Sequence, residues 1–385
     1  MIGWLLLAVA LLFLVAHLVT VGLFLRRLGP GQMQPGTLGL PRITLLRPVC
    51  GVDQFDAETL GSSFTQDYPD YEIIFCAPSQ TDPAVPLVRE LLAAHPNKAA
   101  QLLVGEVAVT GNPKLNNLWK GWQAAGADWV CMTDSNLLLP PDYLRRVVSA
   151  WGPDTGLVSC PPTGARPDGL AACLECAMLN SNQARLQFAS GSLGHAYAQG
   201  KTLFWNRDML NKAGGIAALG RYLAEDVNAT KLVRAAGLRV SLTPLPFAQP
   251  IGRRSFATVW NRQLRWSRVR RDGFPLVFAT EIANGAALPF LAVGLAVLMS
   301  GWPLALIPAY VAVWYGAEIY LMRRAGWPSA WRDLLALPLR DALLPVLWAT
   351  TFLQRGIEWR GTAMTPPQLG AGPGPEPELD EVRNQ

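Results

Sequence analysis

Three aspartates, Asp82, Asp134 and Asp226, stand where predicted strands or loops end. Asp134 directly follows an apolar strand predicted over residues 129–132, Asp82 closes the loop after an earlier strand, and Asp226 begins a helix. In open α/β sheets ligands bind beyond the carboxyl ends of the strands, so carboxylates there would line one crevice. A crevice of that charge is costly unless a cation or a ligand fills it. Taken singly, each aspartate is equally an ordinary helix cap or turn residue.

Small polar side chains follow Asp134 along the chain. Ser135 supplies a hydroxyl and Asn136 an amide. One carboxylate flanked by such groups suits a hard divalent cation that is also held by substrate phosphates. The same three residues are common in turns, and that alternative stays open for this stretch alone.

A second candidate for chemistry is the run Arg262-Gln263-Leu264-Arg265-Trp266. On a predicted helix, Arg262 and Arg265 share one face, and Trp266 lies one turn after Arg262. Guanidinium groups suit a diphosphate, and Trp266 could stack on a sugar or anchor in a membrane interface. The alternative is a basic helix that only touches lipid headgroups.

Composition points to membrane segments. Half of the 385 residues are apolar and 16% are charged, which is below the roughly 25% charged residues of average soluble domains. The net charge is +5, and seven arginines without any acid lie between Arg253 and Arg271. Because this basic stretch runs directly into an apolar segment, it favours a membrane surface and phosphate over nucleic acid.

Four apolar segments are candidates for membrane contact. Residues 2–25 are long enough to cross a bilayer and are followed at once by two arginines, which predicts a retained anchor with the downstream side in the cytoplasm. Residues 274–299 and 304–321 read as a hairpin with both ends in the cytoplasm. Residues 334–353 are interrupted by two prolines, an arginine and an aspartate, which fits a re-entrant or interfacial element better than a clean span.

Between these segments the chain alternates strands with helices, the pattern of an α/β fold with a mostly parallel sheet and flanking helices. Strands are predicted over residues 43–49, 72–77, 101–104, 129–132, 156–160, 201–205 and 239–243, and the last of these is the last strand expected. A polar loop over residues 111–117 leads into a predicted helix over residues 118–125, and another helix is predicted from residue 170 to about residue 187. The expected organisation is an anchor (1–27), a linker (28–41), a catalytic domain (42–272), C-terminal membrane segments (273–355) and a disordered tail (356–385).

Several short segments of the sequence resemble GT-A fold glycosyltransferases of family 2 type and, among them, the ceramide glucosyltransferase group of family 21. The resemblance runs from about residue 43 to residue 271. The segments that carry it are residues 66–76, 81–84, 111–117, 133–135, 169–172 and 222–226, and the RxxRW run 262–266.

The resemblance implies roles for individual residues. Asp82 matches the aspartate that contacts the nucleotide of a sugar donor, and Asp134 the one that engages the divalent metal and the donor diphosphate. Asp226 matches the general base that takes the proton of the acceptor hydroxyl. Lys114 matches a lysine near the donor. Two departures stand out, since Asn136 replaces a second carboxylate after Asp134 and Gln183 replaces a histidine of the ceramide-type relatives.

The remaining motif residues, Arg262, Arg265 and Trp266, match the segment that closes over the diphosphate and the acceptor. The implied activity is inverting transfer of a sugar, glucose first, from a UDP-sugar to a membrane lipid hydroxyl, ceramide first, assisted by Mg²⁺ or Mn²⁺. The implied place is the bacterial inner membrane, with the catalytic domain facing the cytoplasm and no nucleic-acid partner. The sequence carries no signal for the oligomeric state.

Other readings remain open. Glycosyldiacylglycerol synthases and hopanoid glycosyltransferases share the same general pattern. A processive polysaccharide synthase shares the RxxRW word, but the small number of apolar segments argues against a chain-translocating pore. A membrane protein that binds nucleotide-sugar or lipid without turnover is the alternative from another class.

Overall fold

A seven-stranded sheet forms the centre of the region between the N-terminal and C-terminal apolar helices in the computed structural model, which describes residues 1–29, 37–222, 224–353, 357–359 and 362–364. Its strand order is β3-β2-β1-β4-β7-β5-β8. The bounds are β1 Ile43–Pro48, β2 Tyr71–Ala77, β3 Ala100–Val104, β4 Trp129–Thr133, β5 Thr155–Ser159, β7 Thr202–Asn206 and β8 Arg239–Leu242. Strands β1 to β4 pair in parallel, as do β5 and β8, whereas β7 runs antiparallel to β4 and β5. The predicted mixed, mostly parallel sheet is confirmed.

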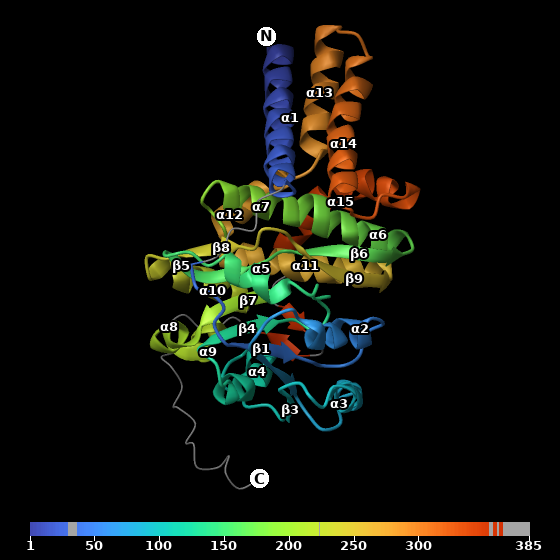
Figure 1. The fold of residues 1–385 in the computed structure, drawn as a ribbon. Helices are drawn as coiled ribbons and strands as arrows, with labels where there is room; N and C mark the ends of the chain where they lie inside the picture. Colours follow the sequence, from blue (N-terminus) through green and yellow to red (C-terminus); the bar gives the residue numbers. More distant parts are fainter. Residues whose placement is uncertain (30–36, 223, 354–356, 360–361, 365–385) are drawn as a thin grey trace.

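Helices cover both faces of this sheet, and each face has its own apolar core (Figure 1). Phe75 and Tyr143 lie in the core on one face, and Trp122 and Trp205 in the core on the other. The first face is covered by α2 (Asp56–Gly61), η1 (Ser62–Thr65), α3 (Ala84–Ala94) and α5 (Tyr143–Ser149). The second is covered by α4 (Pro113–Ala124), α8 (Arg207–Lys212), α9 (Gly215–Ala218), η3 (Leu219–Arg221) and α10 (Glu225–Ala235). Burial on both faces explains why the strands are near-continuous apolar runs.

A second, two-stranded parallel sheet was not predicted from the sequence. It pairs β6 (Pro162–Asp168) with β9 (Phe247–Arg253), so the prediction that the strand at 239–243 is the last one before the membrane segments was wrong. Prolines and glycines interrupt both strands, and Arg166 has a positive φ of 51°. These features break the alternation by which strands are recognised.

A long helical segment follows β6 in the chain. The sequence predicted a helix over residues 170–187, and the structure has α6 (Leu170–Ala177), a π-helical turn η2 (Met178–Ala184) and α7 (Arg185–Ser192) in direct succession. Helix α11 (Phe256–Gly273), which carries the RxxRW run, packs on α6. It continues into α12 (Pro275–Thr280) and η4 (Glu281–Ala283).

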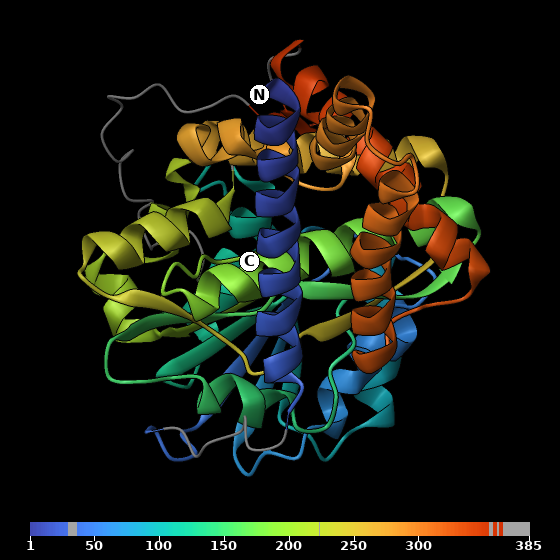
Figure 2. The same cartoon turned by 90° about the horizontal axis from the view of Figure 1, so that it is seen from above.

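The apolar helices gather on one side of the molecule (Figure 1). Seen from above, α1 passes across the middle of the domain (Figure 2). The helices are α1 (Ile2–Arg27), α13 (Ala287–Ser300), α14 (Leu306–Arg324) and α15 (Trp331–Leu353). In the described part of the chain, α1 and α15 are long and apolar enough to cross a membrane, and α12 to α13 would make a third span if its bend of 44° lies within one crossing.

Two sequence expectations change at these helices. The apolar segment 274–299 is not one straight helix, because the chain breaks between η4 and α13. Residues 334–353, which were expected to form a re-entrant or interfacial element, belong to the single helix α15 with Pro338 and Pro345 inside it. By length and composition α15 qualifies as a span, whereas α14, the predicted second arm of the hairpin, does not.

A buried ionic cluster joins these helices to the domain. The guanidinium of Arg340 on α15 pairs with both carboxylate oxygens of Glu318 on α14 at 3.0 Å each, and it also donates to the Ser181 hydroxyl on η2. Arg185 on α7 lies 3.0 Å from the imidazole Nδ1 of His17 on α1. All five side chains are buried. The cluster therefore fixes three of the apolar helices onto the π-helical turn and α7.

The C-terminal tail was expected to be disordered. Ile357–Trp359 (β10) and Thr362–Met364 (β11) instead pair as antiparallel strands. The rest of the tail lies outside the described residues.

Candidate active site

Asp134 is held between two lysines at the edge where β4 ends. Its Oδ1 lies 2.6 Å from Nζ of Lys114, and its Oδ2 lies 3.0 Å from Nζ of Lys201. Lys201 comes directly before β7, and because β7 is antiparallel to β4 it starts where β4 stops. The Asp134 amide accordingly donates to the Lys201 carbonyl at 3.2 Å. The antiparallel strand thus brings a second ammonium group to the carboxylate.

Lys114 connects Asp134 to the helix that carries Asp226. Its ammonium group also donates to Oε1 of Glu225 at 2.6 Å and to the Gly200 carbonyl at 2.8 Å. Asn112 orders this arrangement, because its Oδ1 accepts from the Lys114 amide at the start of α4 while its Nδ2 donates to Glu225 at 3.1 Å. The sequence predicted a polar loop up to residue 117 and a helix from residue 118, but Pro113 begins the helix, so Lys114 lies in its first turn.

Asp226 lies in the first turn of α10. Its Oδ2 accepts from the Gly200 amide at 3.1 Å and its Oδ1 from the Val227 amide at 2.8 Å. Burial and the neighbouring Glu225 carboxylate raise the pKa of Asp226 to about 7, against the opposing effect of the Lys114 ammonium group and the two backbone hydrogen bonds. A carboxylate that exchanges a proton near neutral pH is suited to general base catalysis.

Lys114 and Asp134 hold each other in their charged forms. Burial alone would raise the pKa of Asp134, but Lys114 and Lys201 outweigh it and hold that pKa well below its ordinary value. Burial would likewise lower the pKa of Lys114, but Asp134 and Glu225 raise it. For Lys201 burial prevails over Asp134, and the nearby Arg262 and Lys114 add to the lowering of its pKa. Arg262 on α11 is therefore close enough to act electrostatically on this cluster.

Asp82 takes a different position from the other two aspartates. Its carboxylate accepts from the Gly51 amide after β1, at 2.9 and 3.1 Å, and from the Ala84 amide at the start of α3, at 2.8 Å. It braces the loops after β1 and β2. Among the described contacts Asp82 is not joined directly to Lys114. Its position is compatible both with bracing these loops and with contacting a nucleotide.

The RxxRW residues lie on one helix but face different surroundings. Arg262 forms an ion pair with Glu175 of α6, a carboxylate that is 0% exposed. Arg265 is half-buried one turn further along. The Trp266 ring is partly buried and packs against Leu179 and other apolar residues of α6, η2 and β9.

Three residues of this site were missed in the sequence. Lys201 carries no motif, and its role follows only from the antiparallel placement of β7. Glu225 was read only as part of the helix start. Arg47, on the otherwise apolar β1, is 0% exposed and donates through Nη2 to the carbonyls of Asp134, Ser135 and Leu137 at 3.0, 2.9 and 3.2 Å. An arginine inside a buried strand is the one sequence signal that could have revealed it.

Comparison with known proteins identifies the family of this chain. The sequence profile described as "Glycosyl transferase family 21" matches residues 3–368. The chain belongs to glycosyl transferase family 21. Ceramide glucosyltransferase 1 of Caenorhabditis elegans is 28% identical over 244 residues, which cover 63% of this chain and 52% of that protein. Ceramide glucosyltransferase of Komagataella phaffii is 30% identical over 287 residues, which cover 60% and 56%.

This family 21 glycosyltransferase thus spans about half the length of these two relatives. Ceramide glucosyltransferase 3 of Caenorhabditis elegans is 24% identical over 335 residues, or 83% of this chain and 72% of that protein. Among solved structures, the mannosyltransferase PcManGT from Pyrobaculum calidifontis, in complex with GDP-Man and Mn²⁺, has a TM-score of 0.50 and 20% identity, and the match covers 88% of this chain and 99% of that one. This likeness shows the fold and confirms the GT-A type expected from the sequence.

Proposed function

We propose that this glycosyltransferase moves a sugar, glucose first, from a UDP-sugar to the hydroxyl of a membrane lipid, ceramide first, with inversion at the anomeric carbon. The observation that carries the proposal is the Asp226 carboxylate, whose pKa is raised to about 7. Its neighbour Glu225 forms an ion pair with Lys114, which also pairs with Asp134. The relatives named as ceramide glucosyltransferases support the choice of lipid and sugar.

In this proposal Asp226 is the general base. Two backbone amides, those of Gly200 and Val227, fix its carboxylate, so it meets an incoming hydroxyl in one orientation. The hydroxyl proton passes to Asp226 while the hydroxyl oxygen forms a bond to the anomeric carbon. The bond from that carbon to the donor diphosphate breaks with its electron pair on the leaving oxygen. Attack opposite the leaving group inverts the anomeric configuration.

The donor diphosphate would lie beside Asp134, Lys114 and Lys201. The two ammonium groups are placed to meet developing negative charge on the leaving group. Asp82, at the neighbouring strand edge, would contact the nucleotide. Arg262, three residues before Arg265, would close over the diphosphate after exchanging its present partner.

The residues around Asp134 also fit a divalent cation. In the described residues no group of three or more His, Cys, Asp or Glu is placed to hold a metal. Asp134 with the Ser135 hydroxyl and the Asn136 amide would offer oxygen ligands of the kind that Mg²⁺ or Mn²⁺ accepts when phosphates complete its shell. Lys114 and Lys201 would first release the Asp134 and Asn136 oxygens that they now contact. When bound, the cation would neutralise charge on the leaving diphosphate.

The membrane helices suggest where the reaction takes place. The apolar helices α1 and α15 support membrane association. Arg26 and Arg27 at the end of α1, and Arg323 and Arg324 at the end of α14, favour a catalytic domain in the cytoplasm under the positive-inside rule. We place the protein in the bacterial inner membrane, where a lipid can present its headgroup without leaving the bilayer.

UDP release by purified protein in detergent tests the proposal. UDP-glucose, UDP-galactose, UDP-N-acetylglucosamine and UDP-glucuronate are each offered with ceramide, diacylglycerol or a hopanoid polyol in the presence of Mg²⁺ or Mn²⁺. We expect release that requires a lipid and is lost in Asp226→Asn. The matched control is Asp208→Asn, because Asp208 also lies in the first turn of a helix but is exposed.

The outcomes separate the readings. Equal release from Asp226→Asn would remove Asp226 as the base and leave it as a helix-start residue. Release with diacylglycerol or the hopanoid polyol, but not with ceramide, would replace the acceptor. Binding of UDP without release from any pair would support the non-catalytic alternative.

A further inference from the structure

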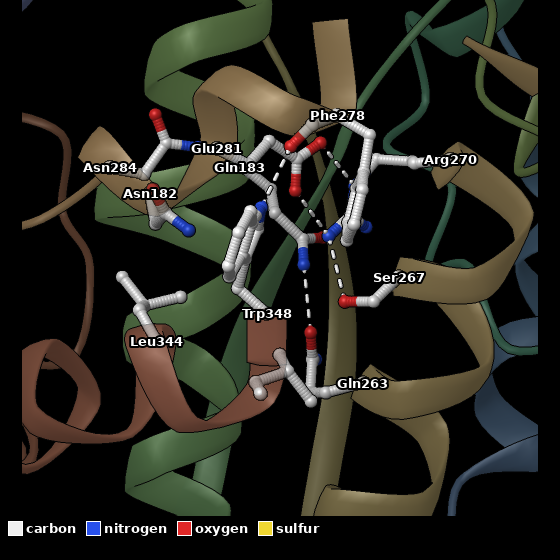
Figure 3. Close-up of a pocket in the computed structure, with 11 residues that line it drawn as sticks. Asn182, Gln183, Gln263, Ser267, Arg270, Phe278, Glu281, Asn284, Leu344 and Trp348 are labelled. Carbon is white, nitrogen blue, oxygen red and sulfur yellow. Dashed lines mark hydrogen bonds and ion pairs between the residues drawn. The ribbon is translucent and has the colours of Figure 1, made fainter. Parts of the chain in front are cut away.

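A polar pocket lies between the π-helical turn η2, helix α11 and the segments η4 and α15 (Figure 3). Asn182 and Gln183 reach it from η2, and Gln263 and Arg270 from α11. Gln183 Nε2 donates to Gln263 Oε1 at 2.9 Å. Arg270 pairs with both carboxylate oxygens of Glu281, at 2.7 and 2.9 Å. The amides and the ion pair form one polar side of the pocket.

Two buried polar atoms in this pocket have no hydrogen-bond partner within the described structure. They are Nε2 of Gln263, whose residue is 1% exposed, and Oδ1 of Asn182, whose residue is 7% exposed. A buried polar atom without a partner costs about 1–3 kcal/mol. A ligand that accepts one hydrogen bond from Gln263 and donates another to Asn182 would satisfy both atoms.

Apolar side chains also line the pocket. They are Phe278 of α12 and Leu344, Leu347 and Trp348 of α15, and the Trp348 indole is fixed by donating to the Phe278 carbonyl at 3.1 Å. Helix α15 is apolar and long enough to cross a membrane. A polar head can therefore contact the amides while hydrocarbon continues along the apolar helix, an arrangement suited to an amphiphile.

Helix α11, which lines part of the pocket, also packs on the first turn of α10, where the proposed base lies. Gly273 ends α11 one turn after Arg270, and it packs so closely on Val227 that a Cβ there would lie 2.8 Å from a Val227 methyl group. Burial raises the pKa of Tyr197. The Arg270 guanidinium opposes this rise, whereas the carboxylates of Glu281 and Asp226 add to it. Tyr197 is therefore influenced electrostatically both by the ion pair of the pocket and by Asp226.

We infer that this pocket binds the head of the lipid acceptor and selects a lipid that carries a secondary amide beside its reacting hydroxyl. Gln263 donates to the amide carbonyl, and Asn182 accepts from the amide N–H. This rests on the proposed function, because it describes the acceptor side of the same site.

The chemistry of the alternatives makes the selection specific. A diacylglycerol offers ester oxygens that accept hydrogen bonds, but its one hydroxyl proton is the proton that leaves during transfer. It has no further donor for Asn182, whose oxygen would stay buried and unpaired. A secondary amide meets both groups with one planar unit.

Binding is measured first, independently of turnover. Short-chain ceramide, the same ceramide methylated on its amide nitrogen, and short-chain diacylglycerol are titrated into the purified full-length protein in detergent, with thermal unfolding as the readout. We expect wild type to bind ceramide about tenfold tighter than either other lipid, the discrimination of roughly one buried hydrogen bond. Asn182→Leu should erase the preference for ceramide over its N-methyl form, and Gln263→Met should weaken both.

Two controls protect this test against misfolding. Asn182→Leu removes no described hydrogen bond of Oδ1, so the lipid-free variant should unfold at or above the wild-type temperature. Gln66→Met is the matched control for Gln263→Met, since Gln66 is also buried but bonds to the Ser62 and Pro140 carbonyls, away from the pocket. It should retain the wild-type lipid preference even if it is less stable.

Failure of the inference and failure of the proposed function give different results. Equal binding of ceramide and N-methyl ceramide by wild type, or a preference unchanged in both pocket variants, overturns the inference even if sugar transfer is observed. A preference that the pocket variants abolish supports it even if no UDP is released, in which case only the transferase proposal fails.

Discussion

The carboxylate of Glu225 should set the pH range in which this glycosyltransferase works. Glu225 lies next to Asp226, and after burial its charge is the largest influence that raises the pKa of Asp226 to about 7. Replacing it by glutamine removes the charge but keeps an oxygen that can accept from Lys114 or Asn112, its present donors. We predict that Glu225→Gln lowers the pKa of Asp226.

The size of the effect can be bounded from the contacts. Two carboxylates in one site raise a pKa strongly, but Lys114 bonds directly to Glu225 and neutralises part of its charge. A net shift of about one unit, or ~1.4 kcal/mol, is therefore expected. A base is active when deprotonated, so activity is full above its pKa and is lost as the pH falls through it. At about pH 6 wild type should retain about 10% of its plateau activity and Glu225→Gln about 50%.

The assay is the pH dependence of kcat/KM for the UDP-sugar at a fixed lipid concentration, because this quantity reports the free enzyme. The acid limb should move to lower pH in Glu225→Gln. Glu90→Gln, a substitution of an exposed glutamate on α3, serves as the matched control and should leave the limb in place.

Two results would refute the reasoning. An acid limb that stays fixed in Glu225→Gln would mean that Asp226 is not the titrating base or does not sense its neighbour. A limb that moves to higher pH would mean that freeing Lys114 from Glu225 changes the site in another way, for example by drawing Lys114 closer to Asp134.

Three further predictions test the same structure. Lys201→Met should lower kcat/KM for the UDP-sugar by about 10- to 150-fold, which corresponds to the loss of one charge-assisted hydrogen bond of about 1.5–3 kcal/mol. A variant that matches wild type in steady-state assays would exclude a role for Lys201 in binding the sugar donor. Chelation with EDTA should abolish UDP release and added Mg²⁺ or Mn²⁺ should restore it, whereas full activity in EDTA would show that the two lysines suffice. Glu318→Leu should destabilise the detergent-solubilised protein by roughly 3 kcal/mol, because it leaves Arg340 buried with Asp341 as its remaining carboxylate partner, and an unchanged unfolding transition would contradict that account.

The sheet and the family were predictable because their signals are local. Strand β2 is a continuous apolar run, and β4 ends abruptly at Asp134, so each strand could be placed to within one or two residues. The Asn112-Pro113-Lys114 word marks a helix start by its cap and its proline, although the sequence reading began that helix too late.

The composition of the site depended on sheet topology, which the sequence did not reveal. Lys201 reaches Asp134 only because β7 runs antiparallel into the edge where β4 ends. No residue pattern near 201 distinguishes an antiparallel strand from a parallel one in this position. Arg47 shows the same limit, since its carbonyl partners lie almost ninety positions further along the chain.

The acceptor side could be predicted least, because its residues come from several elements that contact one another only after folding. Asn182 points into the pocket from a π-helical turn, and a π-helix rotates side chains relative to the α-helical spacing from which sequence patterns are judged. Gln263 is an unspecified position within the RxxRW motif, yet its buried Nε2 has no hydrogen-bond partner among the described residues. If the acceptor is selected where we propose, one of the side chains that selects it stands at a position that the RxxRW motif leaves unspecified.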